Sequence, residues 1–403
     1  MDYKPITFHT AIETTLAALS PLESEYLPLE QLVDRKLAED VSSSVDSPSI
    51  DASLKDGYAV RSADIRDASD QPVTLKLIGS RYAGDRNILQ LQPGTTVRVL
   101  TGAAIPAGAD AVLAEEFTTS EGSIITVLNI AEPGRNILHQ GSDVRIGQKI
   151  LSKGAQLHPA AVGLLASAGH THARVFRRPY AALLATGNEV IAPGTPLEPG
   201  KLYASNLVTL AAWCTRHHME SSTMILKDKA AVIEEAIRNA IKNHDIVITS
   251  GGAWSGERDL VVKTLDSIGW EKLFNRVRMG PGKGVAFGLL EGKPVFCLPG
   301  GPPSNLTAFL QLVLPALHHM AGFAKPGLPV KEAVLADAVS GQSSWTQFIF
   351  GTLQEKPNAP LLFTPLPRGS RLQMMASAES ILTIPEGIDH FNAGEPVLVQ
   401  LLI

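Results

Sequence analysis

The sequence predicts a multidomain protein of the α/β and β classes, and three observations lead to this prediction. The chain has 403 residues, more than one hydrophobic core usually serves, so roughly two to four domains are expected. Strand-like and helix-like apolar patterns alternate between residues 180 and 320, which is typical of a parallel sheet with crossover helices. Short alternating runs broken by Gly or Pro lie on both sides of that segment and indicate β-rich domains.

The N-terminal part is predicted to be helical and then extended. Phe8 to Leu19 carries apolar residues at helical spacing, and the helical character continues over Val33 to Ala38. From Val41 the composition shifts to Ser, Pro and Asp, which indicates an extended connection. A helical pattern returns at Pro159 to Ala168, so we expect a β-rich domain to interrupt a helical one.

Alternating apolar and polar runs between Pro72 and Val127 define the inserted β-rich domain. A second set, including Ser380–Ile384 and Val397–Leu401, predicts a small C-terminal β-barrel-like domain after a linker at Ala321–Gly327. The expected boundaries are 1–45 with 141–178 for a discontinuous helical linking domain, 46–140 for the inserted β-rich domain, 179–325 for an α/β domain and 326–403 for the C-terminal β domain.

The α/β domain is expected to present three loops at one edge of its sheet. Its predicted elements are strands over Ala181–Ala185, Ser222–Ile225 and Asp245–Thr249, with helices over Asn206–Arg216, Lys229–Lys242, Ser304–Met320 and after Glu257. Parallel sheets bind ligands beyond the carboxyl ends of their strands. The loops at those ends begin at Thr186, Leu226 and Ser250.

Composition excludes several classes of function. The net charge is −5 and aromatic residues make up 5% of the chain, so neither a basic track nor a stacking surface for nucleic acid is expected. No apolar stretch approaches the length of a membrane span. Two cysteines, Cys214 and Cys297, are too few for a disulfide framework and are predicted to lie in the core, which favours a reducing, cytoplasmic location.

A glycine-rich turn from Thr249 to Asp259 is the strongest candidate for chemistry. Glycines let backbone N–H groups approach a phosphate or oxyanion, and a helix beginning near Glu257 would direct its positive end at that anion. Nearby carboxylates then call for a cation, and Mg²⁺ bridging carboxylate and phosphate oxygens satisfies both. A solvated surface turn is the alternative.

Acidic residues follow all three strand ends: Glu189, Asp228, and Glu257 with Asp259. Together they form a candidate divalent-metal site. The alternative is that each acid caps the helix that follows, and for Asp228, which stands directly before a helix, we expect a cap.

Two further glycine-rich loops are candidate anion sites. Arg278–Gly284 contains one lysine but lacks the spacing and the Ser or Thr of a phosphate-binding P-loop, and a solvated hairpin is an equal alternative. Leu298–Asn305 joins a buried strand to a helix, with prolines that stiffen the approach.

An ordered set of motifs resembles the molybdopterin molybdenumtransferase family, which includes MoeA and the gephyrin E domain, and indicates a divergent member. The motifs are Asp56-Gly57-Tyr58-Ala59-Val60, Thr101-Gly102-Ala103-Ala104-Ile105-Pro106, Thr186-Gly187-Asn188-Glu189, Ser205-Asn206, Ser250-Gly251-Gly252 and Gly394-Glu395-Pro396-Val397. Each motif is weak alone, but their order along the whole chain is specific.

This resemblance implies a fold and a reaction. The α/β domain would be of the molybdopterin-binding type, and the subunit would form a homodimer whose cleft lies between the α/β domain of one subunit and β-rich parts of its partner. The reaction would be Mg²⁺-dependent insertion of molybdate, or tungstate, into adenylylated molybdopterin with release of AMP. The molybdopterin adenylyltransferase is a candidate partner.

The resemblance also implies site residues. Asp56, Asp259 and Lys283 would be catalytic, and Glu189, Asp228 and Asp259 would hold the metal. The residues expected to bind substrate are Thr186, Gly187, Ser250, Gly251, Gly252, Arg278, Gly282, Pro299, Gly300 and Ser304.

Departures from the family pattern fall at these same places. Gly280 stands where the family has the first lysine of its turn, and Gly284 and Gly301 replace a proline and an asparagine. Arg278 is one substitute for the missing charge, if the segment before Gly280 is extended, and Lys55 is another. These departures leave two alternatives open: a non-catalytic cofactor-binding or scaffold protein, and an enzyme that prefers tungstate.

Overall fold

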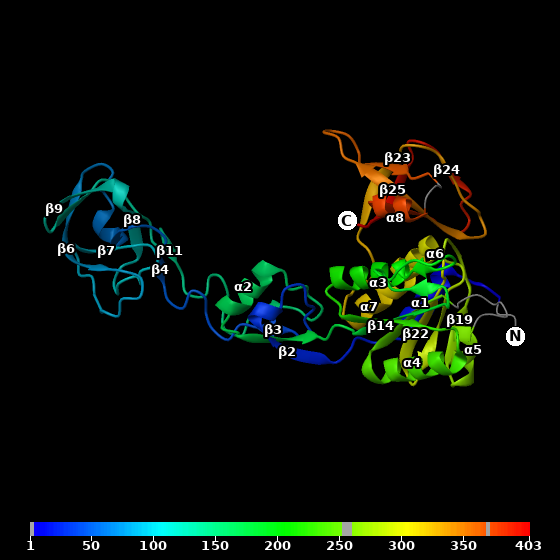
Figure 1. Cartoon of the computed structure of the whole chain (residues 1–403). Coiled ribbons are helices and arrows are strands. Elements are labelled where there is room, and N and C mark those ends of the chain that lie inside the picture. The colour runs from blue at the N-terminus through cyan, green and yellow to red at the C-terminus, as the bar shows by residue number, and fades with distance from the viewer. Residues whose placement is uncertain (1–3, 252–259, 368–370) are drawn as a thin grey trace. The chain divides into compact units, whose positions relative to one another are not determined.

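The computed structural model describes residues 4–251, 260–367 and 371–403. Its contacts divide the chain into two compact units, one made of residues 1–25 with 176–403 and one made of residues 26–175. The chain passes between the units within two short strands, β2 (Ser24–Pro28) and β13 (His172–Phe176). Figure 1 shows the elements of each unit, coloured along the chain.

The unit of residues 26–175 is built around a six-stranded sheet in the order β8-β5-β7-β6-β10-β9. Successive residues of β5 supply different cores: Tyr58 and Val60 belong to one apolar cluster and Ala59 to another, as expected when side chains alternate across a sheet. The sheet strands are β5 (Gly57–Val60), β6 (Val73–Arg81), β7 (Thr95–Val99), β8 (Ala111–Ala114), β9 (Thr118–Glu121) and β10 (Ile124–Val127).

Shorter elements complete this unit. Strand β3 pairs with β12, and β4 pairs with β11. Their bounds, with those of the helices, are β3 (Val41–Ser42), β4 (Ala52–Ser53), β11 (Ile137–Leu138), β12 (Lys149–Leu151), η1 (Leu29–Gln31), η2 (Ser62–Ile65), η3 (Glu115–Phe117) and α2 (Pro159–Ser167).

The prediction of helical structure over Val33–Ala38 is wrong. Asp34 has a positive φ of 61°, which interrupts a right-handed helix. The N–H of Leu37 donates to Ala155 and that of Ala38 to Arg174, so these backbone groups bond to distant segments rather than within a helix. Tertiary pairing that buries Leu37 completely overrides the local helical pattern.

The second unit contains the α/β sheet, in the order β17-β14-β18-β22-β21-β19. Strands β17, β14, β18 and β22 are parallel. Strand β21 runs antiparallel to both of its neighbours, β22 and β19, so the sheet is mixed rather than fully parallel. The strands are β14 (Ala181–Thr186), β17 (Ser221–Leu226), β18 (Ile246–Ser250), β19 (Glu271–Asn275), β21 (Ala286–Leu290) and β22 (Lys293–Leu298), and a separate pair is β15 (Val190–Ile191) with β16 (Leu202–Tyr203).

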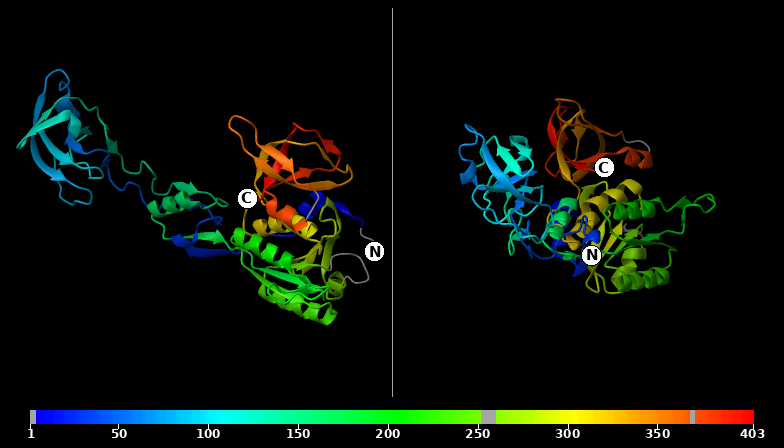
Figure 2. Two further views of the ribbon diagram at one scale, coloured as in Figure 1. Left: turned by 45° about the horizontal axis from the view of Figure 1, so that its top comes forward. Right: turned by 90° about the vertical axis from the view of Figure 1, so that its left-hand side faces the viewer.

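Helices cover both faces of this sheet (Figure 1 and Figure 2). Leu183 of β14 packs with α3, α6 and α7 on one face, and Leu184 packs with α4 and α5 on the other. Since both faces are buried, β14 and β18 have no polar face. The helices are α1 (Phe8–Ala17), α3 (Ser205–Arg216), α4 (Ala230–Asn243), α5 (Leu260–Ser267), α6 (Pro302–Ala308) and α7 (Leu314–Met320).

The predicted helix Ser304–Met320 is one helical run with a π-helical segment, η4 (Phe309–Val313), between α6 and α7. Pro315 is the second residue of α7, two residues beyond that segment. Because proline has no N–H to donate and its ring crowds the carbonyl four residues back, the wider turn accommodates it. Among the described residues, no helix has the length and apolar character needed to cross a membrane.

The C-terminal part is a closed sheet in which β25-β26-β23-β29-β27 pair in order and β27 returns to β25. Strands β20 and β1 extend it at one edge. The elements are β1 (Ile6–Thr7), β20 (Val277–Gly280), β23 (Val330–Leu335), β24 (Val339–Ser340), β25 (Thr346–Gln354), β26 (Leu362–Pro365), α8 (Arg371–Ser377), β27 (Ser380–Ile384), β28 (His390–Phe391) and β29 (Pro396–Leu401).

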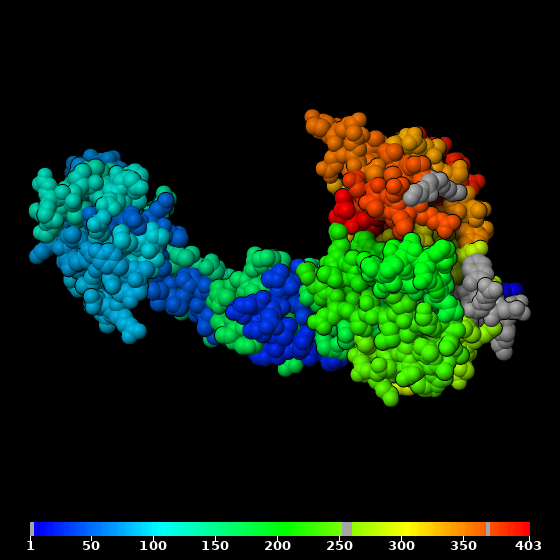
Figure 3. Space-filling model, in the orientation of Figure 1, coloured from blue at the N-terminus to red at the C-terminus, as the bar shows by residue number. Residues whose placement is uncertain are grey.

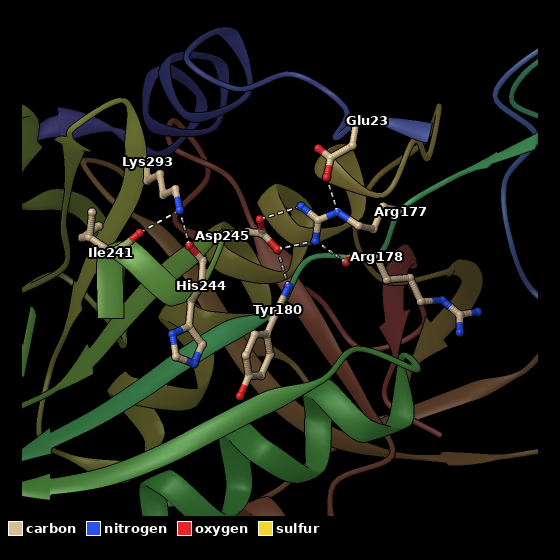
Figure 4. Close-up of polar contacts among 8 residues, drawn as sticks. All are labelled: Glu23, Arg177, Arg178, Tyr180, Ile241, His244, Asp245 and Lys293. Atoms are coloured by element: carbon tan, nitrogen blue, oxygen red, sulfur yellow. Dashed lines mark hydrogen bonds and ion pairs between the residues drawn. The ribbon is translucent and has the colours of Figure 1, made fainter. Parts of the chain in front are cut away.

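An ion-pair network stabilises the start of the α/β sheet (Figure 4). The Arg177 guanidinium donates to both carboxylate oxygens of Asp245, each at 2.7 Å, and to Glu23, while the Tyr180 N–H also donates to Asp245. Burial acts to raise the pKa of Asp245, but the hydrogen bonds from Arg177 and Tyr180 outweigh it and hold that pKa below its usual value.

Candidate functional site

The carboxyl ends of four parallel strands meet at one edge of the α/β sheet. Thr186 of β14 pairs with Leu226 of β17, and Ser250 of β18 pairs with Ala185 on one side and Leu298 of β22 on the other. The loops that follow these strands therefore begin side by side, as the sequence predicts. Thr186 and Ser250 are both buried.

Ser250 is held by two asparagine amides. Its hydroxyl oxygen accepts from Asn206 Nδ2 at 3.1 Å and from Asn305 Nδ2 at 3.0 Å. Each amide is oriented by a backbone carbonyl, because Asn206 also donates to Gly300 O and Asn305 to Pro299 O, both at 2.9 Å. Two N–H donors fill the acceptor lone pairs of the hydroxyl, so its own O–H remains to donate to a ligand.

Gly251 contributes space rather than a backbone donor. Its N–H donates to Leu298 O at 3.0 Å, so it is not available to a bound anion. Its φ of 95° suits glycine, and a Cβ there would lie 2.9 Å from the Thr186 carbonyl oxygen. Gly187 is similar, since a Cβ would lie 2.8 Å from a Glu189 carboxylate oxygen.

A cavity of about 650 Å³ opens at this edge; we call it the strand-end cavity. Five of the predicted site residues line it: Thr186, Glu189, Ser250, Gly251 and Gly300. The size suits a small-molecule ligand. Figure 3 shows this unit's surface, where the orange C-terminal part packs on the green α/β part.

A second cavity, of about 630 Å³, adjoins the first; we call it the barrel cavity. Gly301 and Arg371 line both cavities. The predicted residue Ser304 lies in its wall. Its apolar side chains come from β25, from the residue after β26 and from α8: Phe348, Ile349, Phe350, Leu366 and Met374.

Two of the three expected metal ligands, Glu189 and Asp228, lie within the described residues, on the loops that follow β14 and β17. The prediction that Asp228 caps helix α4 is wrong. The N-cap residue is Lys229, and the Asp228 carboxylate instead accepts from the Asn188 N–H at 3.1 Å while its own N–H donates to the Asn188 side chain. Asp228 thus couples the loop after β17 to the loop after β14 that carries Glu189.

Carboxylate oxygens at the edge of a sheet are donors that suit Mg²⁺. Glu189 and Asp228 are both exposed, so water could complete the coordination of an ion. Within the described ranges, no group of three potential ligands is close enough to hold a metal. The expected third ligand, Asp259, lies outside the described residues, as does Gly252.

Comparison with known proteins gives the same assignment along the chain. Residues 6–169 match the model of the MoeA N-terminal region (domain I and II), and residues 182–319 match that of a probable molybdopterin binding domain. A molybdopterin molybdenumtransferase of Haemophilus influenzae is 38% identical over 304 residues, 75% of this chain and 74% of that protein. Molybdopterin molybdenumtransferase 2 of Mycobacterium tuberculosis is 32% identical over 381 residues, 93% and 94% of the two chains. The chain belongs to the molybdopterin molybdenumtransferase family.

Solved structures extend this family assignment to the fold. Two crystal structures of a molybdopterin biosynthesis MoeA protein from Pyrococcus horikoshii each superpose with a TM-score of 0.85, at 32% and 28% identity, and each match covers 99% of this chain. The predictions of this family and of a transferase are therefore confirmed.

The two positively charged residues in and beside the Gly280–Gly284 turn do not line either cavity, although the sequence predicts both in the site. Arg278 lies on extended strand β20, but its guanidinium donates to the Glu386 carboxylate at 2.7 and 3.2 Å. Lys283 is exposed and lines neither cavity in the described part of the chain. Gly282 has a φ of 115°, and a Cβ there would lie 3.0 Å from the Met279 side chain and 3.4 Å from Ser304 O. The turn therefore needs a residue without a side chain at this position.

Asp56 lies in the other unit, in a hollow that Lys55, Thr101 and Glu115 also line. One carboxylate oxygen accepts from the Thr101 N–H at 2.7 Å and from its hydroxyl at 2.8 Å. These hydrogen bonds hold the pKa of Asp56 below its usual value. Asp56 is therefore ionised at neutral pH.

The sequence does not identify three residues of the site as functional groups: Asn206, Asn305 and Arg371. Asn206 belongs to the Ser205-Asn206 motif and Asn305 ends the Leu298–Asn305 loop, but neither has a chemical role that the local sequence reveals. Arg371 is more than a hundred residues from the glycine turn and belongs to no motif. Only the packing of α8 against α6 and β25 brings it to the cavities.

Proposed function

We propose that the chain catalyses the insertion of molybdate into adenylylated molybdopterin, with release of AMP. The observation that carries this proposal is the strand-end cavity, where a dedicated O–H donor on Ser250 faces space enclosed by Thr186, Gly251 and Gly300. Such a donor suits the oxygen of a phosphate group.

The proposal gives the carboxylates distinct duties. Glu189, Asp228 and Asp259 would hold Mg²⁺, which when bound supplies positive charge to the pyrophosphate oxygens. Asp56 is kept ionised by Thr101, so it can accept a proton or orient a nucleophile but cannot act as an acid at neutral pH. Lys283 remains the proposed catalytic lysine of the Gly280 turn.

The residues that would contact the substrate come from the loops after β14, β18 and β22 and from the Gly280 turn. Thr186, Gly187, Ser250, Gly251 and Gly252 would surround the phosphate groups, and Pro299 and Gly300 would complete that wall with the carbonyls that orient the two asparagines. Ser304 would contact the oxyanion from the barrel cavity. Gly282 and Arg278 would shape this site from the neighbouring turn.

The four-part domain division, a cytoplasmic location and a homodimer belong to the same proposal. Asp56 lies in a different unit from the cavities, and in a homodimer it would act on the substrate held by the partner subunit. The molybdopterin adenylyltransferase, which would make the adenylylated substrate, is the proposed delivery partner.

The test is to incubate the full chain with adenylylated molybdopterin, Mg²⁺ and molybdate and to measure AMP by chromatography. We expect AMP release that requires molybdate and Mg²⁺, and its loss in Asp56→Asn and Asp259→Asn. No metal-dependent release by the wild-type chain would refute the proposal. Unchanged release by a variant would remove that aspartate from the site.

A further inference from the structure

The oxyanion site of this chain lacks the positive charges expected beside it. Gly280 and Pro281 form one wall of the barrel cavity and carry no charge. Arg278, the substitute expected from the sequence, is held by Glu386 through two hydrogen bonds. Its charge is thereby largely compensated within the protein.

Arg371 is the one charged residue among the described residues that line the barrel cavity. It also lines the strand-end cavity, where the other described cation is Lys201. Lys201 donates to the Asn188 carbonyl at 2.8 Å. No hydrogen bond or ion pair joins the Arg371 guanidinium to another described residue, so its donors are available at the junction of the two cavities.

Helix α8 fixes the position of this arginine. Met374 and Met375 pack against the core shared with α6 and β25. Leu372 lines the strand-end cavity and Met374 the barrel cavity, so the first turn of the helix, which begins at Arg371, borders both cavities. Apolar walls that include Phe348 and Phe350 reduce the local dielectric and strengthen attraction between a cation and an anion.

We propose that Arg371 is the oxyanion-binding cation of this chain and that it holds a tetrahedral dianion of the molybdate class where the two cavities meet. A guanidinium presents a planar fork of N–H donors that matches two oxygens of such an anion. This inference rests on the proposed function and adds the residue that supplies the missing charge.

The test is calorimetric titration of molybdate into the full chain without nucleotide or pterin. Arg371→Ala is expected to weaken binding about 10- to 100-fold, since it removes a charge-assisted pair of hydrogen bonds. Arg371→Lys keeps the charge but loses the fork, and its affinity should lie between those of the wild type and Arg371→Ala. Gln373→Ala on the same helix and Arg238→Ala on a distant exposed helix face are matched controls and should bind like the wild type.

The outcomes separate this inference from the proposed function. Arg371→Ala that binds molybdate as tightly as the wild type overturns it, as does a wild-type chain that binds no molybdate at millimolar concentration. Molybdate binding that depends on Arg371 in a wild-type chain without AMP release would refute the proposed function and leave Arg371 as an oxyanion ligand. Tryptophan fluorescence during unfolding verifies that each variant folds, because all four tryptophans lie in the unit that contains Arg371.

Discussion

Replacing Ser250 by alanine tests the asparagine-held hydroxyl that organises the strand-end cavity. The substitution removes the oxygen that accepts from Asn206 and Asn305. Asn305 is 1% exposed, so water cannot replace the lost acceptor there, and one stranded buried N–H costs about 1–3 kcal/mol. Asn206 is half-buried and its amide can turn to water, so the expected loss in free energy of unfolding remains about 1–3 kcal/mol.

The neighbouring Thr249 provides a matched control. Its hydroxyl is also buried on β18, but it has no hydrogen-bond partner among the described residues. Thr249→Val keeps the shape and removes only that hydroxyl, so stability should be unchanged or slightly increased. The two variants thus lose the same chemical group at adjacent positions, but only Ser250→Ala is expected to lose stability.

Urea unfolding followed by tryptophan fluorescence measures both stabilities, since every tryptophan lies in this unit. In the AMP-release assay, Ser250→Ala should raise the KM for adenylylated molybdopterin roughly tenfold or more, because a hydrogen bond to a charged group is lost. Thr249→Val should keep the wild-type KM. Equal stability and equal KM in Ser250→Ala and Thr249→Val would refute the assignment of Ser250 as a held donor.

Three other predictions follow from the described contacts. Gly251→Ala places a Cβ 2.9 Å from the Thr186 carbonyl at a φ of 95°, so we expect a loss of about 1–3 kcal/mol in unfolding free energy by urea titration, and an unchanged value would contradict it. Asp245→Asn should lower stability by about 1–3 kcal/mol at neutral pH. Because the folded-state pKa of Asp245 is lowered, its stabilisation is complete above about pH 4 and is lost as pH falls through the folded pKa, so wild type and variant should converge in acid; parallel curves would be inconsistent with this. At limiting molybdate, where each variant alone should have little activity, mixing Asp56→Asn with Arg371→Ala subunits should restore about a quarter of wild-type activity if a homodimer shares its sites, whereas no recovery would argue that both residues act within one subunit.

The α/β part could be predicted from the sequence because its apolar strand runs and its amphipathic helices both show clear patterns. Leu183 and Leu184 lie in different cores. The strands β14 and β18 are mainly apolar, and each is followed by a turn that contains glycine. The strand ends at Thr186 and Ser250 follow from the same pattern. Over Val33–Ala38 the local pattern failed, because backbone pairing with distant segments decides the conformation there.

The site was only partly predictable, since its charges depend on contacts between distant segments. Arg278 is on the expected strand, yet its guanidinium donates to the carboxylate of Glu386, more than a hundred residues later in the chain. Asp228 is next to a helix start, yet it bonds to Asn188 on another loop. Arg371 reaches the cavities through helix packing that no local motif encodes.

Formation of active molybdenum cofactor tests the proposed function most directly. The full chain would be incubated with adenylylated molybdopterin, molybdate and Mg²⁺, and the product would be measured by activation of an apo-molybdoenzyme alongside AMP. We predict that activation and AMP appear together in equal amounts and that both fall in Arg371→Ala at limiting molybdate. Release of AMP without any activating cofactor would contradict metal insertion as the function of this chain.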